Sequence, residues 1–322
     1  MKPYSALVPA IGAEYLGAGG IMTQGQAWFV KPYSGNDGNS GKRPDRAVKT
    51  LAKALALATA NQNDVVYMMA ESNTSASTTD YQSTQLDWNK DGVHLIGVNA
   101  GNFLGQRSRI AQISTWTSAD PLFKLSADNC LLANLGMFSG VADATTLGCM
   151  TVTGTRNKIY NCQISGIGNA ANDIDGAYSL YLNGAAENIF ERCYIGLDTI
   201  PRSTNTNSEI LVAGVATRNM FLDCTVVSQI GHATYHPYVY LNGATAVDRW
   251  LHFKRCTFLN FATNYGFTQA VVFLHSATPT EGVIWVENSS AMATNWSATG
   301  KKVYISNSAI NTAYTGGTGY TA

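Results

Sequence analysis

Short segments in which apolar and polar residues alternate recur along the chain. The segments 156–162 (RNKIYNC), 187–193 (ENIFERC) and 218–224 (RNMFLDC) each carry an Asn five residues before a Cys, and 249–256 (RWLHFKRC) keeps the alternation without the Asn. A period of two residues is typical of strands, whereas helices repeat about every 3.6 residues. Each segment is therefore predicted to form a short strand.

The spacing of these segments predicts a structural repeat of about 31 residues. Cys130 lies outside the register of the other cysteines, and the pentapeptide YLNGA at 181–185 recurs at 240–244, about two periods later. A near-constant interval of this size indicates stacked supersecondary units, of which at least five are visible. The intervals are 31, 31 and 32 residues in the series Cys162, Cys193, Cys224 and Cys256.

The repeat is typical of strands joined by turns. Asn-Gly and Ser-Gly turns interrupt the units too often for the paired helices of tetratricopeptide or ankyrin repeats. Like residues at one inward position in every unit describe an all-β parallel β-helix with coils of about 31 residues. Because neighbouring strands lie about 4.8 Å apart, eight coils over residues 64–310 are predicted to form a rod roughly 38 Å long.

Two ladders of like residues are expected inside the rod. The four cysteines at the regular interval are predicted to stack as small buried thiols, and Asn157, Asn188 and Asn219 are predicted to stack at a turn, where amides bond along the ladder. Zinc ligands come as close pairs, so thiols placed one per coil are not expected to bind a metal. Disulfides between neighbouring coils remain possible in distance but require an oxidising compartment.

Residues before the repeats predict a lid for one end of the rod. In the segment 43–60, one helix face carries the apolar residues Val48, Leu51, Leu55 and Ala58, which favours a capping helix over the exposed core. The loop around Asp37 lacks the spacing of a calcium loop. The predicted divisions are an N-terminal arm at 1–27, a strand, loop and capping helix at 28–63, the β-helix at 64–311, and a C-terminal tail at 312–322.

Composition and charge narrow the class of partner. Charged residues make up 13% of the chain, and 21 basic residues balance 21 acidic ones. Zero net charge removes the electrostatic attraction on which binding to nucleic acid or anionic membranes depends, so neither partner is expected. We also expect no signal peptide in the first twenty residues and no transmembrane helix, because no apolar run is long enough.

The segments 28–55, 63–71 and 91–99 together resemble the opening of the right-handed parallel β-helix proteins of the pectate-lyase-like superfamily, especially virion structural proteins of tailed phages. The resemblance implies a non-enzymatic virion protein, either a head decoration protein or a spike, assembled in the host cytoplasm. It also implies that the arm binds capsid or tail proteins. Low charge and flat rod faces predict a homotrimer. The alternatives are a tailspike-like polysaccharide depolymerase and a rod that binds host glycans.

Candidate catalytic residues are sparse. Polysaccharide cleavage requires paired carboxylates, or carboxylates that hold calcium beside a Lys or Arg. Asp173 and Asp175 are the best local match, and the depolymerase alternative would use them with Glu209 or His232. A cluster of His232, Tyr235, His236 and Tyr238 favours a packed loop over a sugar site. The main expectation is therefore no catalytic residue, cofactor or metal, with most aromatic residues in or beside the core.

Overall fold

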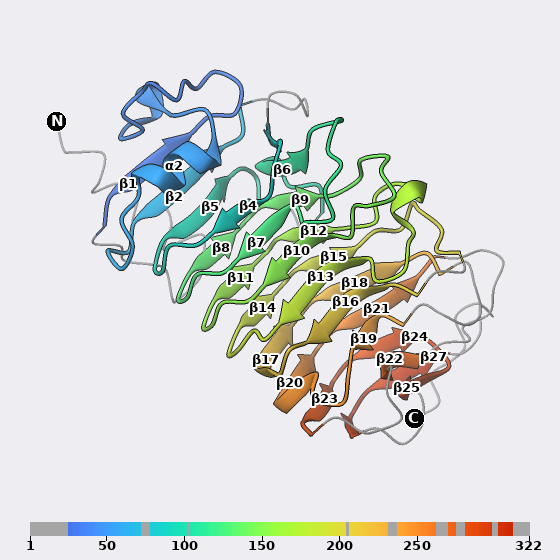
Figure 1. Cartoon of the computed structure of the whole chain (residues 1–322). Coiled ribbons are helices and arrows are strands. Elements are labelled where there is room, and N and C mark those ends of the chain that lie inside the picture. Colours follow the sequence, from blue (N-terminus) through green and yellow to red (C-terminus); the bar gives the residue numbers. More distant parts are fainter. Residues whose placement is uncertain are drawn as a thin grey trace.

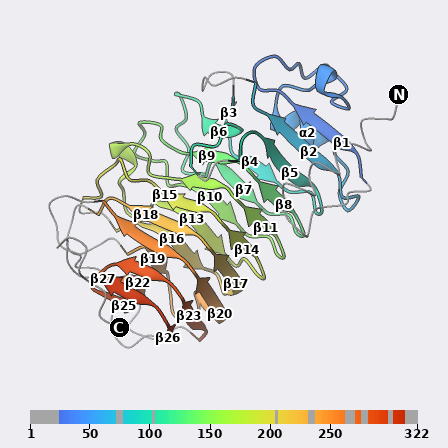
Figure 2. The ribbon, with the colours of Figure 1, turned by 180° about the vertical axis from the view of Figure 1, so that it is seen from behind.

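Three parallel sheets wind around one axis and form a parallel β-helix (Figures 1 and 2). The computed structural model describes residues 25–71, 78–101, 104–203, 206–230, 237–261, 270–274, 281–297 and 302–311. Within these residues the sheets contain ten, eight and nine strands, and every strand pairs in parallel with its neighbours. The all-β solenoid predicted from the repeat is confirmed. Residues 1–24 of the predicted arm at 1–27 lie outside the described residues, as does the tail at 312–322, and the last residue of the predicted arm, Ala27, already belongs to strand β1.

Each coil contributes one strand to each sheet in turn. Sheet A contains β1 (Ala27–Val30), β2 (Val65–Met69), β5 (His94–Val98), β8 (Leu131–Ala133), β11 (Lys158–Tyr160), β14 (Ile189–Glu191), β17 (Ala216–Leu222), β20 (Val247–Lys254), β23 (Val283–Glu287) and β26 (Val303–Ser306). Sheet B contains β3 (Thr79–Gln82), β6 (Arg109–Gln112), β9 (Gly136–Phe138), β12 (Gln163–Ser165), β15 (Tyr194–Gly196), β18 (Thr225–Ser228), β21 (Thr257–Asn260), β24 (Ser290–Met292) and β27 (Ala309–Asn311). Sheet C contains β4 (Leu86–Trp88), β7 (Phe123–Leu125), β10 (Gly148–Val152), β13 (Tyr178–Asn183), β16 (Ser208–Ala213), β19 (Val239–Leu241), β22 (Ala270–Leu274) and β25 (Asn295–Ser297).

The core is built from rows of apolar side chains that point inward from each sheet. In sheet A, Ile159 is followed in register by Phe190, Phe221 and Phe253, and all four are fully buried. The three phenylalanine rings stack with centroids 4.7 and 4.8 Å apart, which is the spacing of neighbouring strands. The alternation seen in the sequence therefore marks the inward face correctly.

The asparagine ladder is confirmed by its hydrogen bonds. The backbone N–H of Asn157 donates to Oδ1 of Asn188, and the N–H of Asn188 donates to Oδ1 of Asn219, at 2.9 and 3.1 Å. Cys130 occupies the position before its strand that Asn157 occupies one coil later, and its N–H donates to Asn157 Oδ1. This explains why Cys130 lies outside the cysteine register.

The cysteine ladder also stacks as predicted, because each member immediately precedes a paired strand of sheet B. All six cysteines are buried and carry free thiols. Burial raises the pKa of Cys162 and Cys224 well above the ordinary thiol value. Because the thiolate is the reactive form, these groups are chemically quiet inside the fold.

The first residues of the two YLNGA copies lie in sheet C, on the two strands that flank the same central strand. Tyr181 of β13 pairs with Leu211 of β16, which pairs with Tyr240 of β19. The 59-residue separation therefore corresponds to two coils, as predicted. These side chains lie on the outer face of sheet C and form an apolar cluster with Tyr178, whose hydroxyl lies 2.8 Å from the Thr151 hydroxyl.

The segment 43–60 is not one helix. It forms a 3-10 turn, η2 (Pro44–Arg46), and a short helix, α2 (Leu51–Leu57), with extended backbone between them. At this break the Asp37 carboxylate accepts hydrogen bonds from the backbone N–H groups of Lys49 and Thr50 and from the Thr50 hydroxyl, and Val48 pairs with Val30 of β1. Leu51, Ala54 and Leu55 of α2 are buried in the main core. No helix among the described residues combines the length and apolar character that a bilayer crossing requires.

Candidate functional site

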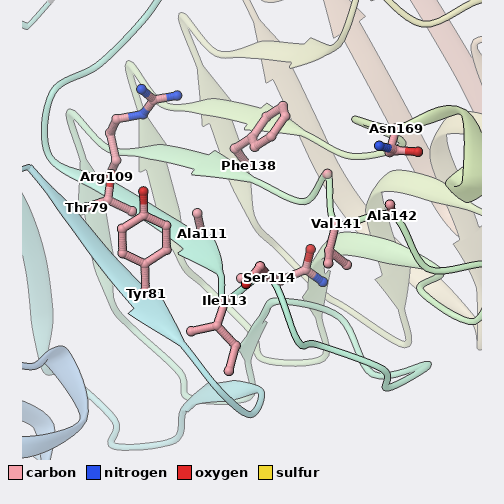
Figure 3. A pocket seen from close by; sticks show the side chains of 12 residues that line it. Thr79, Tyr81, Arg109, Ala111, Ile113, Ser114, Phe138, Val141, Ala142 and Asn169 are labelled. Atoms are coloured by element: carbon pink, nitrogen blue, oxygen red, sulfur yellow. The ribbon is translucent and has the colours of Figure 1, made fainter. Parts of the chain in front are cut away.

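A pocket of about 570 Å³ lies over the outer face of sheet B, near its N-terminal end (Figure 3). Strands β3, β6 and β9 supply its floor, and the loops that follow β6, β9 and β12 supply its far side. This volume lies within the usual range of small-molecule binding pockets. The lining residues are Thr79, Tyr81, Arg109, Ala111, Gln112, Ile113, Ser114, Phe138, Gly140, Val141, Ala142 and Asn169.

Two aromatic residues lie on either side of a small residue in the floor. Tyr81, Ala111 and Phe138 are register partners on three adjacent strands, and Figure 3 shows Ala111 between the two rings. Because parallel strands lie about 4.8 Å apart, the two aromatic residues are separated at the backbone by roughly 9.6 Å. The alanine therefore leaves a slot with aromatic walls, and the Tyr81 side of it is half exposed.

Two glycines allow the Phe138 ring to lie where it does. A Cβ atom at Gly140 would come within 2.5 Å of the ring, and one at Gly168 within 2.7 Å. Real side-chain carbons do not approach this closely, so any larger residue at either position would displace the ring. The loops after β9 and β12 thus fix one wall of the slot through their lack of side chains.

The polar groups of the pocket are one cation and several neutral donors and acceptors. Arg109 is the charged residue among those that line it, and it lies beside Thr79 as a register partner. The Ser139 hydroxyl donates to Oε1 of Gln112 at 3.1 Å, while Nε2 of Gln112 is buried without a hydrogen-bond partner. A guanidinium carries only hydrogen-bond donors and therefore seeks oxygen acceptors. The pocket therefore favours an oxygen-rich ligand with negative charge.

The predicted carboxylate pair lies elsewhere and has a structural role. Asp173 and Asp175 follow the 3-10 turn η4 (Ala170–Asn172) rather than lying side by side on a strand. Asp173 accepts hydrogen bonds from Ser203 and Asn207, and Asp175 accepts one from the backbone N–H of Thr206. Both carboxylates therefore tie the loop of one coil to that of the next.

Those of the other predicted candidates that the structure describes do not line the pocket. Glu209 forms an ion pair with Arg202 at 2.8 Å, and both side chains are only 1% exposed. The Ser179 hydroxyl donates a hydrogen bond to the second carboxylate oxygen of Glu209. His232, Tyr235 and His236 lie outside the described residues, whereas Tyr238 is a core residue in edge contact with Phe258. Among the described residues, no three His, Cys, Asp or Glu side chains come together as a possible metal site.

The sequence contains a signal for this pocket in the alternation of residues along β6. Arg109 and Ala111 flank the buried Ile110, so alternation places both of them on the outer face of one strand. The coils that hold β3 and β6 lack the Asn and Cys markers, and these strands were therefore not aligned with β9. Without that alignment, Tyr81 and Phe138 could not be recognised as neighbours.

Comparison with known proteins supports the fold. No protein-family model and no curated protein sequence matches the chain. Among solved structures, the pectate lyase Pel9A aligns with a TM-score of 0.61 at 12% identity, over 91% of this chain and 78% of that one. The pectin methylesterase PemA from Erwinia chrysanthemi aligns at 0.58 and 14% identity, over 90% of each chain. The chain has the right-handed parallel β-helix fold that these two enzymes share.

The same comparison contradicts the expectation of a non-enzymatic protein. A pectin methylesterase from Aspergillus niger also aligns over 90% of this chain, with a TM-score of 0.55 and 15% identity, so the β-helix fold found here is one that pectin-processing enzymes share. The expectation was wrong because it relied on the lack of a familiar carboxylate motif. At such low identity the likeness shows the fold alone, and the ligand must be inferred from the residues of this chain.

Proposed function

We propose that this protein is a polysaccharide-binding β-helix of the kind that processes acidic glycans, with the pocket over sheet B holding one acidic sugar. The slot between Tyr81 and Phe138, with Arg109 beside it, is the observation that carries the proposal. Aromatic walls pack against the C–H faces of a sugar ring. A guanidinium beside them pairs with a carboxylate through two parallel hydrogen bonds.

Arg109 is suited to recognition rather than proton transfer. A guanidinium stays charged at every pH that proteins tolerate, so it holds an anion without acting as an acid or base. The names of the structural neighbours, pectate lyase and pectin methylesterase, support an acidic polysaccharide as the ligand class. The low charge of the whole chain means that this attraction is local to the pocket, since no general field draws in a polyanion.

Binding of matched hexasaccharides tests the proposal. We expect a hexasaccharide of galacturonic acid to bind more tightly than one of galactose, measured by isothermal titration calorimetry. Arg109→Gln should weaken binding of the acidic sugar about 10- to 100-fold, because one charge-assisted pair is lost. Arg107→Gln is the matched control, since Arg107 is an exposed arginine two residues away and does not line the pocket.

The same samples report on cleavage. Reaction products are followed as new reducing ends in the titrated mixtures, and release of shorter oligosaccharides would place the chain among the depolymerases. Equal affinity of the wild type and Arg109→Gln for the acidic hexasaccharide would refute the role of the pocket. Failure of every acidic hexasaccharide to bind would refute the proposed ligand class.

A further inference from the structure

A second group of aromatic side chains lies on the outer face of sheet A, in the C-terminal coils. His252 of β20, Trp285 of β23 and Tyr304 of β26 are register partners on three adjacent strands. Trp285 is 48% exposed and Tyr304 is 59% exposed. Rings this large are seldom left in water on neighbouring strands without a binding function. This row lies on a different sheet from the pocket and toward the other end of the rod (Figures 1 and 2).

The Trp285 ring is held in place from one side. The His252 ring packs against it with centroids 5.4 Å apart and an interplanar angle of 31°. Trp250 in turn meets His252 edge-on at 6.3 Å, and Nε2 of His252 lies 3.2 Å from a carboxylate oxygen of Glu287. The indole is therefore supported before any ligand arrives, which reduces the entropy lost on binding.

A row of polar side chains runs parallel to the row of rings. Lys254, Glu287 and Ser306 are also register partners, two residues further along the same three strands, so they lie on the same outer face. Lys254 Nζ and Glu287 Oε1 are 2.9 Å apart. The two opposite charges neutralise each other while keeping further donor and acceptor capacity at the edge of the aromatic row.

We propose that these two rows form a second glycan-binding surface, specific for uncharged sugars, in which pyranose rings stack on Trp285 and Tyr304. A pyranose has an apolar C–H face and a rim of hydroxyl groups, and the surface matches both parts. The exposed rings receive the C–H face, and Lys254, Glu287 and Ser306 exchange hydrogen bonds with the hydroxyls. Because the charges cancel, this surface gives no preference for an acidic sugar.

The size of the patch argues against a protein partner. A stable protein interface buries about 800 Å² on each side and has a large apolar centre. The aromatic row presents two exposed rings and is bordered directly by an ion pair, which is small for such an interface but sufficient for two sugar rings. A glycan chain also extends in one direction, as the row does along the stacked coils.

Tryptophan fluorescence with a galactose hexasaccharide tests this surface in the full-length protein. Trp285 is the most exposed described tryptophan, since Trp250 is only partly exposed and Trp28, Trp88, Trp116 and Trp296 are all buried. Bound sugar should therefore protect the wild type from acrylamide quenching and shift its emission to shorter wavelength. In calorimetry, Trp285→Ala and Tyr304→Ala should each weaken binding of the neutral sugar about tenfold.

The controls separate this surface from other exposed rings. Tyr33→Ala removes another exposed ring, at 66% exposure, and should leave neutral-sugar binding unchanged. Trp285→Phe keeps a ring and should keep most of the affinity, which guards against misfolding as an explanation. Unchanged neutral-sugar affinity in both alanine variants would refute the proposal. A second result would also refute it: the wild type binds no glycan, and the alanine variants have a lower molecular mass than the wild type. The patch would then be a contact between copies of the chain.

Discussion

Single buried amides connect neighbouring coils, and Asn188 does so on both sides. Its Nδ2 donates to the Gly154 carbonyl and to Oδ1 of Asn219, and its Oδ1 accepts from the Asn157 N–H. Asn188→Ala leaves several of these groups unpaired in the core, so we expect the free energy of unfolding to fall by about 3 kcal/mol. Urea denaturation measures this loss. Asn183→Ala, at an exposed position, should change stability by less than about 0.5 kcal/mol.

A buried histidine makes stability depend on pH. Nδ1 of His94 accepts a hydrogen bond from the Leu131 N–H at 3.0 Å, and burial lowers the pKa of His94 from 6.5 to about 4. Between these values the unfolded chain binds a proton that the folded chain does not. The free energy of unfolding should therefore fall as the pH drops from about 6.5 to 4, by about 3 kcal/mol in total.

Asp80 changes the free energy of unfolding in the opposite direction over an overlapping pH range. It must therefore be replaced before the effect of His94 can be measured. Burial raises the pKa of Asp80 from 3.8 to about 6, so its contribution to stability decreases as the pH rises between these values. We expect Asp80→Asn to become less stable on acidification, and the double variant with His94→Asn to lose that slope. Equal slopes in the two variants, measured by urea denaturation from pH 4 to 7, would assign the acid sensitivity to other groups.

At the scale of elements, the helix α2 is expected to close the N-terminal end of the core. Leu51 is fully buried, and its N–H donates to Asp80 at 2.8 Å. Leu51→Ala should destabilise the fold by about 2 to 5 kcal/mol through the cavity it leaves. If α2 is a cap, hydrogen exchange should accelerate first in β1 and β2. Leu57→Ala, at a partly buried position of the same helix, is the control, and uniform acceleration along the rod would contradict a local capping role.

The spacing of strands along the chain set how far the sequence could predict the fold. Successive inward residues of sheet A are 31 residues apart from Ile159 to Phe190 and again to Phe221, and there the repeat was visible. The interval is 37 residues from Leu95 to Leu132 and 27 from Leu132 to Ile159. Strand spacing along the rod is fixed by hydrogen bonding, whereas loop length between strands is free to vary. The pocket lies among these irregular coils, so its residues could not be aligned from sequence.

The residues of the pocket could not be picked out from the sequence for a related reason. Asp173 and Glu209 attracted attention as carboxylates, but their partners, Ser203 and Arg202, lie in the next long loop, whose path the sequence does not specify. A buried carboxylate that is fully hydrogen-bonded is a structural group. The useful signal was instead the outward position of Arg109 and Trp285 on their strands, which becomes meaningful only when neighbouring strands are in register.

At the scale of the whole molecule, association of rods remains the proposal to test, and we expect a homotrimer. The 21 basic and 21 acidic residues cancel, so no net repulsion opposes contact between copies. Closed symmetry also prevents open-ended growth. Light scattering should give three times the chain mass of 34.5 kDa, and small-angle scattering should give an elongated profile. Because net charge is zero, raising the salt concentration from 0.05 to about 0.5 M should leave the mass unchanged.

The outcome also bears on how the two glycan surfaces work together. In a trimer, three pockets and three aromatic rows are displayed on one particle, so a long polysaccharide can engage several at once and bind far more tightly than a hexasaccharide. In a monomer, the affinity for long chains should exceed that for hexasaccharides by a much smaller factor. A mass of 34.5 kDa together with a strong preference for long chains would contradict the trimer and require both surfaces of one rod to hold the same chain.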